Sequence, residues 1–252
     1  MIKGFYSAVS AMLVGEQRQK LLAHNAANLE TPGFKEVLTS MSDFMNTNVI
    51  SPSGGYSSPA KYVGQLGLGV ETVPEITDYT ASALENTGHS FDLAIANGPG
   101  FFRISTPQGE RLTRDGRFLK DAKGQLVTVE GYQVLDSNGK PITVPEGDFK
   151  VNPDGTMMVG TQTIGKLGIL AFNNPATDLA RDENNKFVAV GKPVAATGVT
   201  VQQGFLESSN VNPSELMTDM VTVSRAYEAA QKMVTTQDDL LNQSITSLGR
   251  IS

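Results

Sequence analysis

Two side-chain amides one helical turn apart, those of Asn25 and Asn28, precede the tripeptide Thr31-Pro32-Gly33. Each amide offers two hydrogen-bond donors and an acceptor, so the pair suits recognition. In a seam between helices of different chains, such groups set the register of the contact at some cost in stability. We therefore expect the two amides to bond a neighbouring chain. The alternative is that they cap the last turn of their own helix.

The tripeptide predicts a hard stop for that helix. The ring of Pro32 disfavours helical backbone at Thr31, so the helix should end there. The pair Pro32-Gly33 suits a type II turn, in which proline presets its φ angle and glycine takes a positive one. Phe34 would then anchor the reversed chain.

Other reactive residue types are few. His24 and His89 are the two histidines, and neither has the spacing of metal ligands. His89, Ser90 and Asp92 are too close in sequence for a catalytic triad, because consecutive strand residues alternate faces. The absence of cysteine removes disulfides, thiolate zinc sites and cysteine nucleophiles. We expect no catalytic residue, no metal and no cofactor, and the net charge of −6 argues against nucleic acid as a partner.

The first of the elements that must position these residues is a helix over about residues 1–31. Alternating steps of four and three residues build a seam that is apolar, then polar, then small. Its members are Phe5, Val9, Met12, Glu16, Gln19, Ala23 and Ala26. Such a stripe buries little by itself, so the helix needs partners.

A second helix is predicted after Asn212, with Asn212 as cap, Pro213 in the first position and Glu215 in the capping-box position. Its apolar seam is about 54 Å long at 1.5 Å per residue. The seam comprises Leu216, Met220, Val223, Tyr227, Ala230, Val234, Gln237, Leu241, Ile245 and Leu248. Basic residues outnumber acidic ones over 1–35 and the reverse holds over 206–252, so we expect the two ends to pair. The acidic second helix and the absence of a run of ~20 apolar residues argue against membrane insertion.

Between the helices, turn-forming pairs such as Asn138-Gly139 and Asp154-Gly155 alternate with short β-type runs, which is typical of antiparallel strands. The predicted fold class is α+β, with terminal helices that pair as a coiled-coil domain and a central, mainly antiparallel β domain. The predicted divisions are an N-terminal helical segment (1–35), an extended connector (36–85), the β domain (86–205) and a C-terminal helical segment (206–252).

Three blocks of the sequence resemble one known family. The block "NAANLETPGFK" at 25–35 is similar to the N-terminal signature of flagellar rod and hook proteins. The block "DLAIANGPGFFRI" at 92–104 looks like the start of their β domain, and "QGFLESSNVNPSELMTDMVTVSRAYEAAQKMV" at 203–234 resembles their C-terminal block. Ala27 departs from the pattern, since the family often has leucine there. The resemblance is best to basal-body rod proteins of the FlgF and FlgG types.

This resemblance implies a structural subunit of the bacterial flagellar rod, a drive shaft for motility that self-assembles through its terminal helices into a tube. The implied partners are copies of the chain itself, other rod and hook proteins, and the flagellar type III export apparatus. The implied location is the periplasm-spanning rod, reached without a cleavable signal peptide. The ending "LLNQSITSLGRIS" favours a proximal, FlgF-like position. The alternatives are a distal, FlgG-like position, another hook–basal-body protein and, from another class, a cell-wall-acting enzyme.

The expected assembly interface draws on the signature, the C-terminal block and the second seam. It comprises Asn25, Asn28, Thr31, Pro32, Gly33, Phe34, Asn210, Asn212, Met220, Val223, Arg225, Tyr227, Val234 and Leu241. For Arg225, which lies off the seam, two interpretations stay open. One is an intersubunit pair with Glu16 or Glu30, and the other is an intrahelical pair with Glu228.

Overall fold

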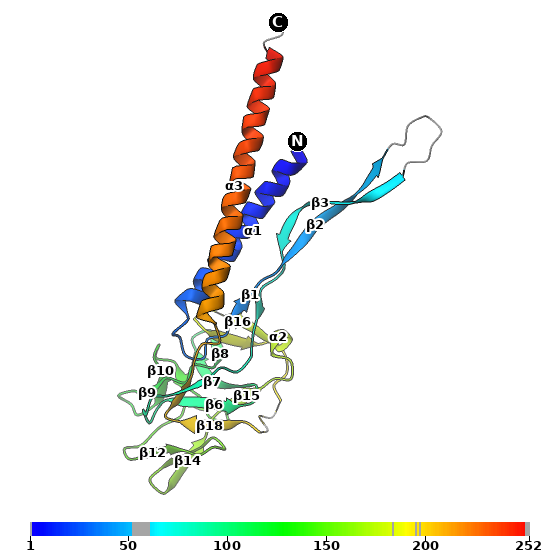
Figure 1. Cartoon of the computed structure of the whole chain (residues 1–252). Helices are drawn as coiled ribbons and strands as arrows, with labels where there is room; N and C mark the ends of the chain where they lie inside the picture. The colour runs from blue at the N-terminus through cyan, green and yellow to red at the C-terminus, as the bar shows by residue number, and fades with distance from the viewer. Residues whose placement is uncertain (1, 52–60, 183, 195, 197, 250–252) are drawn as a thin grey trace. The chain divides into compact units, whose positions relative to one another are not determined.

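The structure is a computed structural model that describes residues 2–51, 61–182, 184–194, 196 and 198–249. Helices lie at both ends of the chain and antiparallel strands lie between them in sequence, so the expected α+β class is confirmed (Figure 1). The chain divides into two compact units. We call Met1–Ala26, Val37–Ile76 and Pro213–Ser252 the helical unit, and Ala27–Glu36 and Thr77–Asn212 the strand unit.

This division differs from the one expected from the sequence. Residues 27–35 and 206–212, which the prediction assigns to the helical segments, belong to the strand unit, as does residue 36, which it assigns to the connector. The expected connector is shared between the two units. The physical reason is a buried polar network, described below, that binds residues 27–36 and 207–210 to the strands.

In the helical unit, α1 (Ile2–Ala27) and α3 (Pro213–Gly249) lie side by side (Figure 1). A Cβ atom built on Gly15 would lie 3.5 Å from Cδ2 of Tyr227, and one built on Gly4 would lie 3.6 Å from Nε2 of Gln237. Because residue numbers fall along α1 as they rise along α3, the helices run antiparallel. The two ends of the chain therefore pair, whereas a coiled-coil geometry stays a prediction.

The seam predicted for α3 is confirmed as far as Gln237, since its later members Leu241 and Ile245 are exposed, and the seam predicted for α1 is wrong in its middle part. On α3, the buried residues Leu216, Val223 and Ala230 all belong to the predicted set. On α1, Glu16 and Gln19 are exposed. The buried residues of α1 are Ala8, Val14, Gly15, Leu22 and Asn25. Small residues such as Gly15 let two helix backbones approach closely, and a search for large apolar side chains passes over them.

The expected connector contains a long antiparallel hairpin in the helical unit. Strands β2 (Met41–Ser51) and β3 (Lys61–Thr72) pair from Met41 opposite Thr72 to Ser51 opposite Lys61. The hydroxyl of Ser10 accepts a hydrogen bond of 3.2 Å from the N–H of Val70, so β3 contacts α1. The segment is therefore extended, as predicted, but its strands are paired. Two short strands, β1 (Val37–Leu38) and β4 (Ile76–Thr77), flank the hairpin in sequence.

The strand unit holds the other described strands and one short helix. They are β5 (Leu84–Asn86), β6 (Leu93–Asn97), β7 (Gly100–Thr106), β8 (Gly109–Thr113), β9 (Phe118–Lys120), β10 (Leu126–Thr128), β11 (Gln133–Val134), β12 (Phe149–Val151), β13 (Thr156–Val159), β14 (Gln162–Lys166), β15 (Ile169–Ala171), α2 (Pro175–Asp178), β16 (Leu179–Asp182), β17 (Lys186–Ala189), β18 (Thr200–Gln203) and β19 (Phe205–Glu207).

The main sheet of this unit has the strand order β16-β17-β8-β7-β11-β10-β9, with β15 also paired to β7. The strand unit also contains a separate three-stranded sheet, β12-β13-β14, and two separate strand pairs, β18-β6 and β19-β5. Among the described residues of this unit, the paired strands run antiparallel, as predicted. The predicted glycine turns are also present. Gly124 (φ 79°) lies between β9 and β10, and Gly155 (φ 83°) lies between β12 and β13.

Strand β7 separates two hydrophobic cores. Its neighbouring residues Phe101 and Phe102 point to opposite faces of the sheet, because side chains alternate along a strand. Phe102 packs in a larger core with Phe118 and Leu93, and Phe101 packs in a smaller one with Phe187. All of these side chains are buried. Over the residues that the structure describes, no helix is both long and apolar enough to cross a membrane.

Candidate functional site

The turn over residues 31–34, which we call the signature turn, has the form that the sequence predicts. The N–H of Phe34 donates to the carbonyl of Thr31 at 3.2 Å, and Gly33 takes a positive φ of 65°. Phe34 is fully buried, and the guanidinium of Arg181 lies 4.8 Å from the centre of its ring. The preceding helix ends earlier than expected, at Ala27, so its last turn does not reach the proline.

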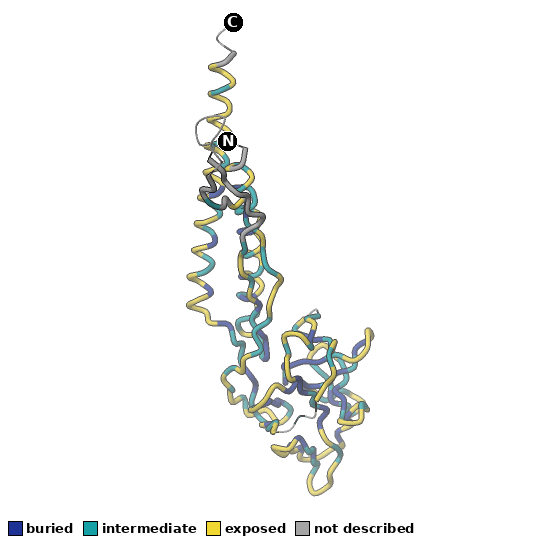
Figure 2. Tube along the Cα trace, turned by 90° about the vertical axis from the view of Figure 1, so that its right-hand side faces the viewer, coloured by how far each residue is buried: buried dark blue, intermediate teal, exposed yellow. Residues whose placement is uncertain are grey.

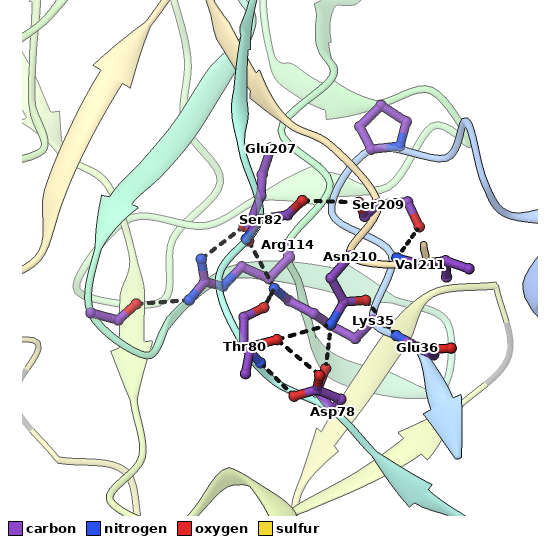
Figure 3. A network of polar contacts seen from close by, with 12 residues as sticks. Lys35, Glu36, Asp78, Thr80, Ser82, Arg114, Glu207, Ser209, Asn210 and Val211 are labelled. Carbon is purple, nitrogen blue, oxygen red and sulfur yellow. Dashed lines mark hydrogen bonds and ion pairs between the residues drawn. The ribbon is translucent and has the colours of Figure 1, made fainter. Parts of the chain in front are cut away.

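Lys35, the residue after this turn, is fully buried. Its Nζ donates to Oε1 of Glu207 at 2.8 Å and to the carbonyl of Thr80 at 2.6 Å (Figure 3). Burial lowers the pKa of the Lys35 ammonium, and the nearby Glu207 carboxylate opposes that shift. A fully buried ammonium is stable only when it is paired and hydrogen-bonded, and both conditions are met here.

Glu207 is the centre of the arrangement. Its Oε2 accepts a bond of 2.8 Å from NH1 of Arg114, and its Oε1 accepts one of 3.1 Å from the N–H of Ser82 (Figure 3). Its backbone carbonyl accepts a bond of 2.7 Å from the N–H of Gly33. Arg114 also donates to the carbonyl of Gly98 at 2.7 Å. One residue therefore binds the signature turn, the loop before β5 and the segment after β8.

Asn210 adds a second set of bonds beside this ion triad. Its Oδ1 accepts from the N–H of Glu36 at 2.7 Å, and its Nδ2 donates to the carbonyl of Asp78 at 2.9 Å and to the hydroxyl of Thr80 at 3.4 Å. Its own N–H donates to the carbonyl of Phe34 at 3.3 Å. We call this whole set the junction network. It comprises Gly33, Phe34, Lys35, Glu36, Asp78, Thr80, Ser82, Arg114, Glu207 and Asn210.

The junction network holds chain segments together. The side chains of Lys35, Arg114 and Glu207 are closed to solvent, so they are placed to bond one another and not an incoming molecule. Removing one partner of a buried ion pair costs about 3–5 kcal/mol, because a buried charge is left uncompensated. The arrangement is therefore a fastening of the 27–36, 77–82 and 207–210 segments.

Asn25 differs from both expectations for it. The side chain is fully buried, its Oδ1 accepts from the N–H of Val37 at 3.2 Å, and its Nδ2 donates to the carbonyl of Val37 at 2.8 Å. The predicted bond to a neighbouring chain is thus replaced by bonds within the helical unit. These bonds join the end of α1 to β1 across the signature turn, a contact that helical periodicity alone does not reveal.

Asn28 follows the alternative expectation more closely. The hydroxyl of Thr31 donates to its Oδ1 at 3.1 Å, and the N–H of Thr31 donates to its carbonyl at 3.2 Å. These are local bonds at the end of the helix, as expected of a capping residue. Pro32 lies in the same turn, and its carbonyl accepts a bond of 3.3 Å from Nδ2 of Asn185.

The remaining predicted interface residues lie along α3 or just before it. Val223 is buried, while Met220, Tyr227 and Val234 are half-buried. Tyr227 packs on Gly15 of α1, so this part of the seam is used within the chain. In the part of the chain that the structure describes, Arg225 forms no ion pair with Glu228, and its side chain is exposed.

Asn212 and Leu241 are also exposed. The helix begins at Pro213, directly after Asn212, as predicted. Whether these exposed residues contact other subunits stays a prediction.

Sequence reasoning missed the ion triad of Lys35, Arg114 and Glu207. Lys35 and Glu207 belong to two of the blocks that resemble the family, but the sequence assigned neither of them a role. The available signal was a charged residue beside a buried phenylalanine or leucine in each block, namely Phe34-Lys35 and Leu206-Glu207. That pattern does not by itself indicate a buried charge, because neighbouring residues of an extended chain point to opposite sides, and it does not identify the partner.

Fold and site together define a structural class of protein, an α+β chain whose buried polar groups fasten its own segments. Two family models match the sequence. The model described as "Flagellar basal body rod FlgEFG protein C-terminal" matches residues 202–248, and the model described as "Flagellar hook protein FlgE/F/G D1 domain" matches residues 94–159.

Curated relatives match the chain over its whole length. The flagellar basal-body rod protein FlgF of Caulobacter vibrioides is 33% identical over 259 residues, which cover 100% of both chains. The rod protein FlgG of Bacillus subtilis is 32% identical over 262 residues, which cover 96% of this chain and 98% of the relative. FlgF of Rhizobium meliloti is 33% identical, with 99% of each chain covered. The chain therefore belongs to the family of flagellar basal-body rod proteins.

Proposed function

We propose that this chain is a structural subunit of the flagellar basal-body rod, which assembles through its terminal helices with copies of itself and with other rod and hook proteins. The observation that carries the proposal is the apolar surface left on these helices after they have packed on each other. The exposed large apolar residues are Tyr6, Leu13, Met217, Val221, Met233, Leu240, Leu241 and Ile245. Exposed apolar patches of this kind mark interaction surfaces.

The end of α3 shows this exposure most clearly (Figure 2). The start of α1 lies beside Gln237, and α3 continues to Gly249, about 18 Å further at 1.5 Å per residue. Leu240, Leu241 and Ile245 are exposed on this part of the helix. We propose that other subunits cover these residues, and that Asn212, Arg225 and the half-buried Met220 and Val234 lie in the same contacts.

For the position in the rod, the proposal favours the proximal, FlgF-like site, and the distal, FlgG-like site is the alternative. The ending "LLNQSITSLGRIS" supports the first. Identities of 33% to a FlgF and 32% to a FlgG are too similar to separate them. The proposal includes delivery by the type III export apparatus to the periplasm-spanning rod. Cryo-microscopy of basal bodies purified from cells that express the chain would locate it.

The assembly role is tested by placing a charge on the exposed apolar surface. Met233→Asp should leave the purified chain as helical as the wild type, because Met233 is exposed. It should prevent incorporation into rods, since a carboxylate would be buried without a partner. The matched control is Gln231→Asp, a change at an exposed polar residue two positions earlier. Normal rods with Met233→Asp, measured by imaging basal bodies, would contradict the proposal.

A further inference from the structure

The chain passes between its two units four times. The passages lie between residues 26 and 27, 36 and 37, 76 and 77, and 212 and 213. These four segments are the covalent connections between the two units, so load can pass along them. The contacts that fix these connecting segments therefore affect how load is passed along them.

Three of the four passages lie within two residues of a member of the junction network, and the first lies in the same segment, six residues before Gly33. Residues 27–36 carry two of the passages and contribute Lys35 and Glu36. Asp78 follows the third passage, and Asn210 precedes the fourth. The network thus bonds together residues 35–36, 78–82 and 207–210, which lie at the strand-unit ends of three passages (Figure 3).

The charges of the network make Glu207 its central residue. The carboxylate of Glu207 pairs with two cations, Lys35 and Arg114, and the side chains of the three residues are 1%, 0% and 3% exposed. Removing Lys35 would leave a balanced pair of Arg114 and Glu207. Removing the charge of Glu207 would leave two buried cations, with Asp78 the one other acid that acts on Lys35. The loss should therefore be larger at Glu207 than at Lys35.

We propose that the junction network fixes the strand-unit ends of these connections, so that load on the connections is passed into the strand unit, with Glu207 as the central positioning residue of the network. The fastening is a property of the single chain. Its role in carrying load rests on the proposed function as a rod subunit.

The fastening is tested by hydrogen exchange on the full-length chain. In Glu207→Gln, the amides of Gly33, Ser82 and Asn210 should exchange faster by on the order of 100-fold. The amides of β7 and β8 should keep their protection. Lys35→Met should produce a smaller change at the same amides. The matched control is Glu110→Gln, which breaks the exposed pair with Arg103 and should leave the three amides unchanged.

A second variant decides the case if Glu207→Gln unfolds the whole chain. Asn210→Ala removes the bonds to Glu36, Asp78 and Thr80 without leaving a buried charge unpaired. It should raise exchange at Glu36 and leave β7 and β8 protected. Unchanged exchange at Glu36 in Asn210→Ala, or at Gly33 and Ser82 in a folded Glu207→Gln, would overturn the proposed fastening.

The role in carrying load is tested in cells with whichever variant stays folded. The variant should enter rods in normal amounts, and swimming speed should fall more steeply than in the wild type as the viscosity of the medium rises. Wild-type swimming despite the lost amide protection would overturn the load-carrying role. If even the wild-type chain fails to enter rods, the proposed function fails and the load-carrying role with it, while the exchange result still decides the fastening.

Discussion

Gly33 meets two separate constraints in the signature turn. Its φ of 65° lies in the left-handed region, where residues with a Cβ are disfavoured by about 1–2 kcal/mol. A Cβ built on it would also lie 2.4 Å from the carbonyl carbon and oxygen of Arg114, which is backbone and cannot rotate away. The turn is therefore closed against a side chain from within the strand unit.

We predict that Gly33→Ala destabilises the strand unit by about 2–4 kcal/mol, the sum of the left-handed backbone cost and the cost of overpacking. Urea unfolding followed by circular dichroism measures the change. The matched control is Gly131→Ala. Gly131 has a φ of 88° but would place its Cβ in open space, so it should lose about 1–2 kcal/mol from the backbone term alone. Equal losses of stability at the two positions would show that the close contact with the Arg114 backbone adds no cost.

At the scale of elements, the packed face of α1 has the small residue Gly15 at its centre. Gly15 lies against Tyr227, and Ala8 and Leu22 are buried one heptad to either side of it. Glu16 and Gln19, which the apolar spacing had placed in the seam, are exposed. The observed seam of α1 is therefore shifted by one residue from the predicted seam. The two seams predict different effects for substitutions at Gly15 and Gln19.

We predict that Gly15→Leu weakens the pairing of α1 with α3 by about 1–3 kcal/mol, because the added side chain must displace Tyr227. Thermal unfolding of the purified chain, monitored by helical circular dichroism, is the measurement. Gln19→Leu is the companion variant, and it should leave the midpoint almost unchanged. The reverse order of effects would support the seam predicted from the sequence.

Local rules accounted for the elements and failed where distant segments meet. The start of α3 at Pro213 and the turn at Pro32-Gly33 follow from backbone preferences of the residues themselves, so both were predictable. The partner of Lys35 lies 172 positions away at Glu207, and no period or motif connects them. The end of α1 at Ala27 was also not predicted. The hydroxyl of Thr31 donates to the side chain of Asn28, and the helix ends ahead of this contact and several residues ahead of the proline.

At the scale of the whole molecule, the units do not follow the order of the chain. The strand unit includes residues 27–36, although residues 37–76 after them belong to the helical unit. Lys35 is held there by Glu207 and by the carbonyl of Thr80. A contiguous β domain over 86–205 would lack both Lys35 and Glu207.

We therefore predict that limited proteolysis of the full chain leaves a resistant core that contains residues 27–36 as well as 77–212. If the protease cuts within 37–76, the two pieces should remain bound, because the junction network lies between them. Native mass spectrometry of the digest would detect the complex. A stable product confined to 86–205, free of the earlier segment, would show that the network is dispensable for the strand unit.

The antiparallel course of α1 and α3 brings the beginning of the first helix and the end of the last helix to the same end of the helical unit (Figure 1). A purification handle or fluorescent label attached at either terminus would therefore enter the same neighbourhood, where the exposed leucines and isoleucine of α3 also lie. The hairpin turn between β10 and β11 is a better place for an epitope inserted after Gly131, since the space around this glycine is open and the glycine itself is kept. Because α1 and α3 run antiparallel, moving a label from one terminus to the other would not take it away from this apolar surface.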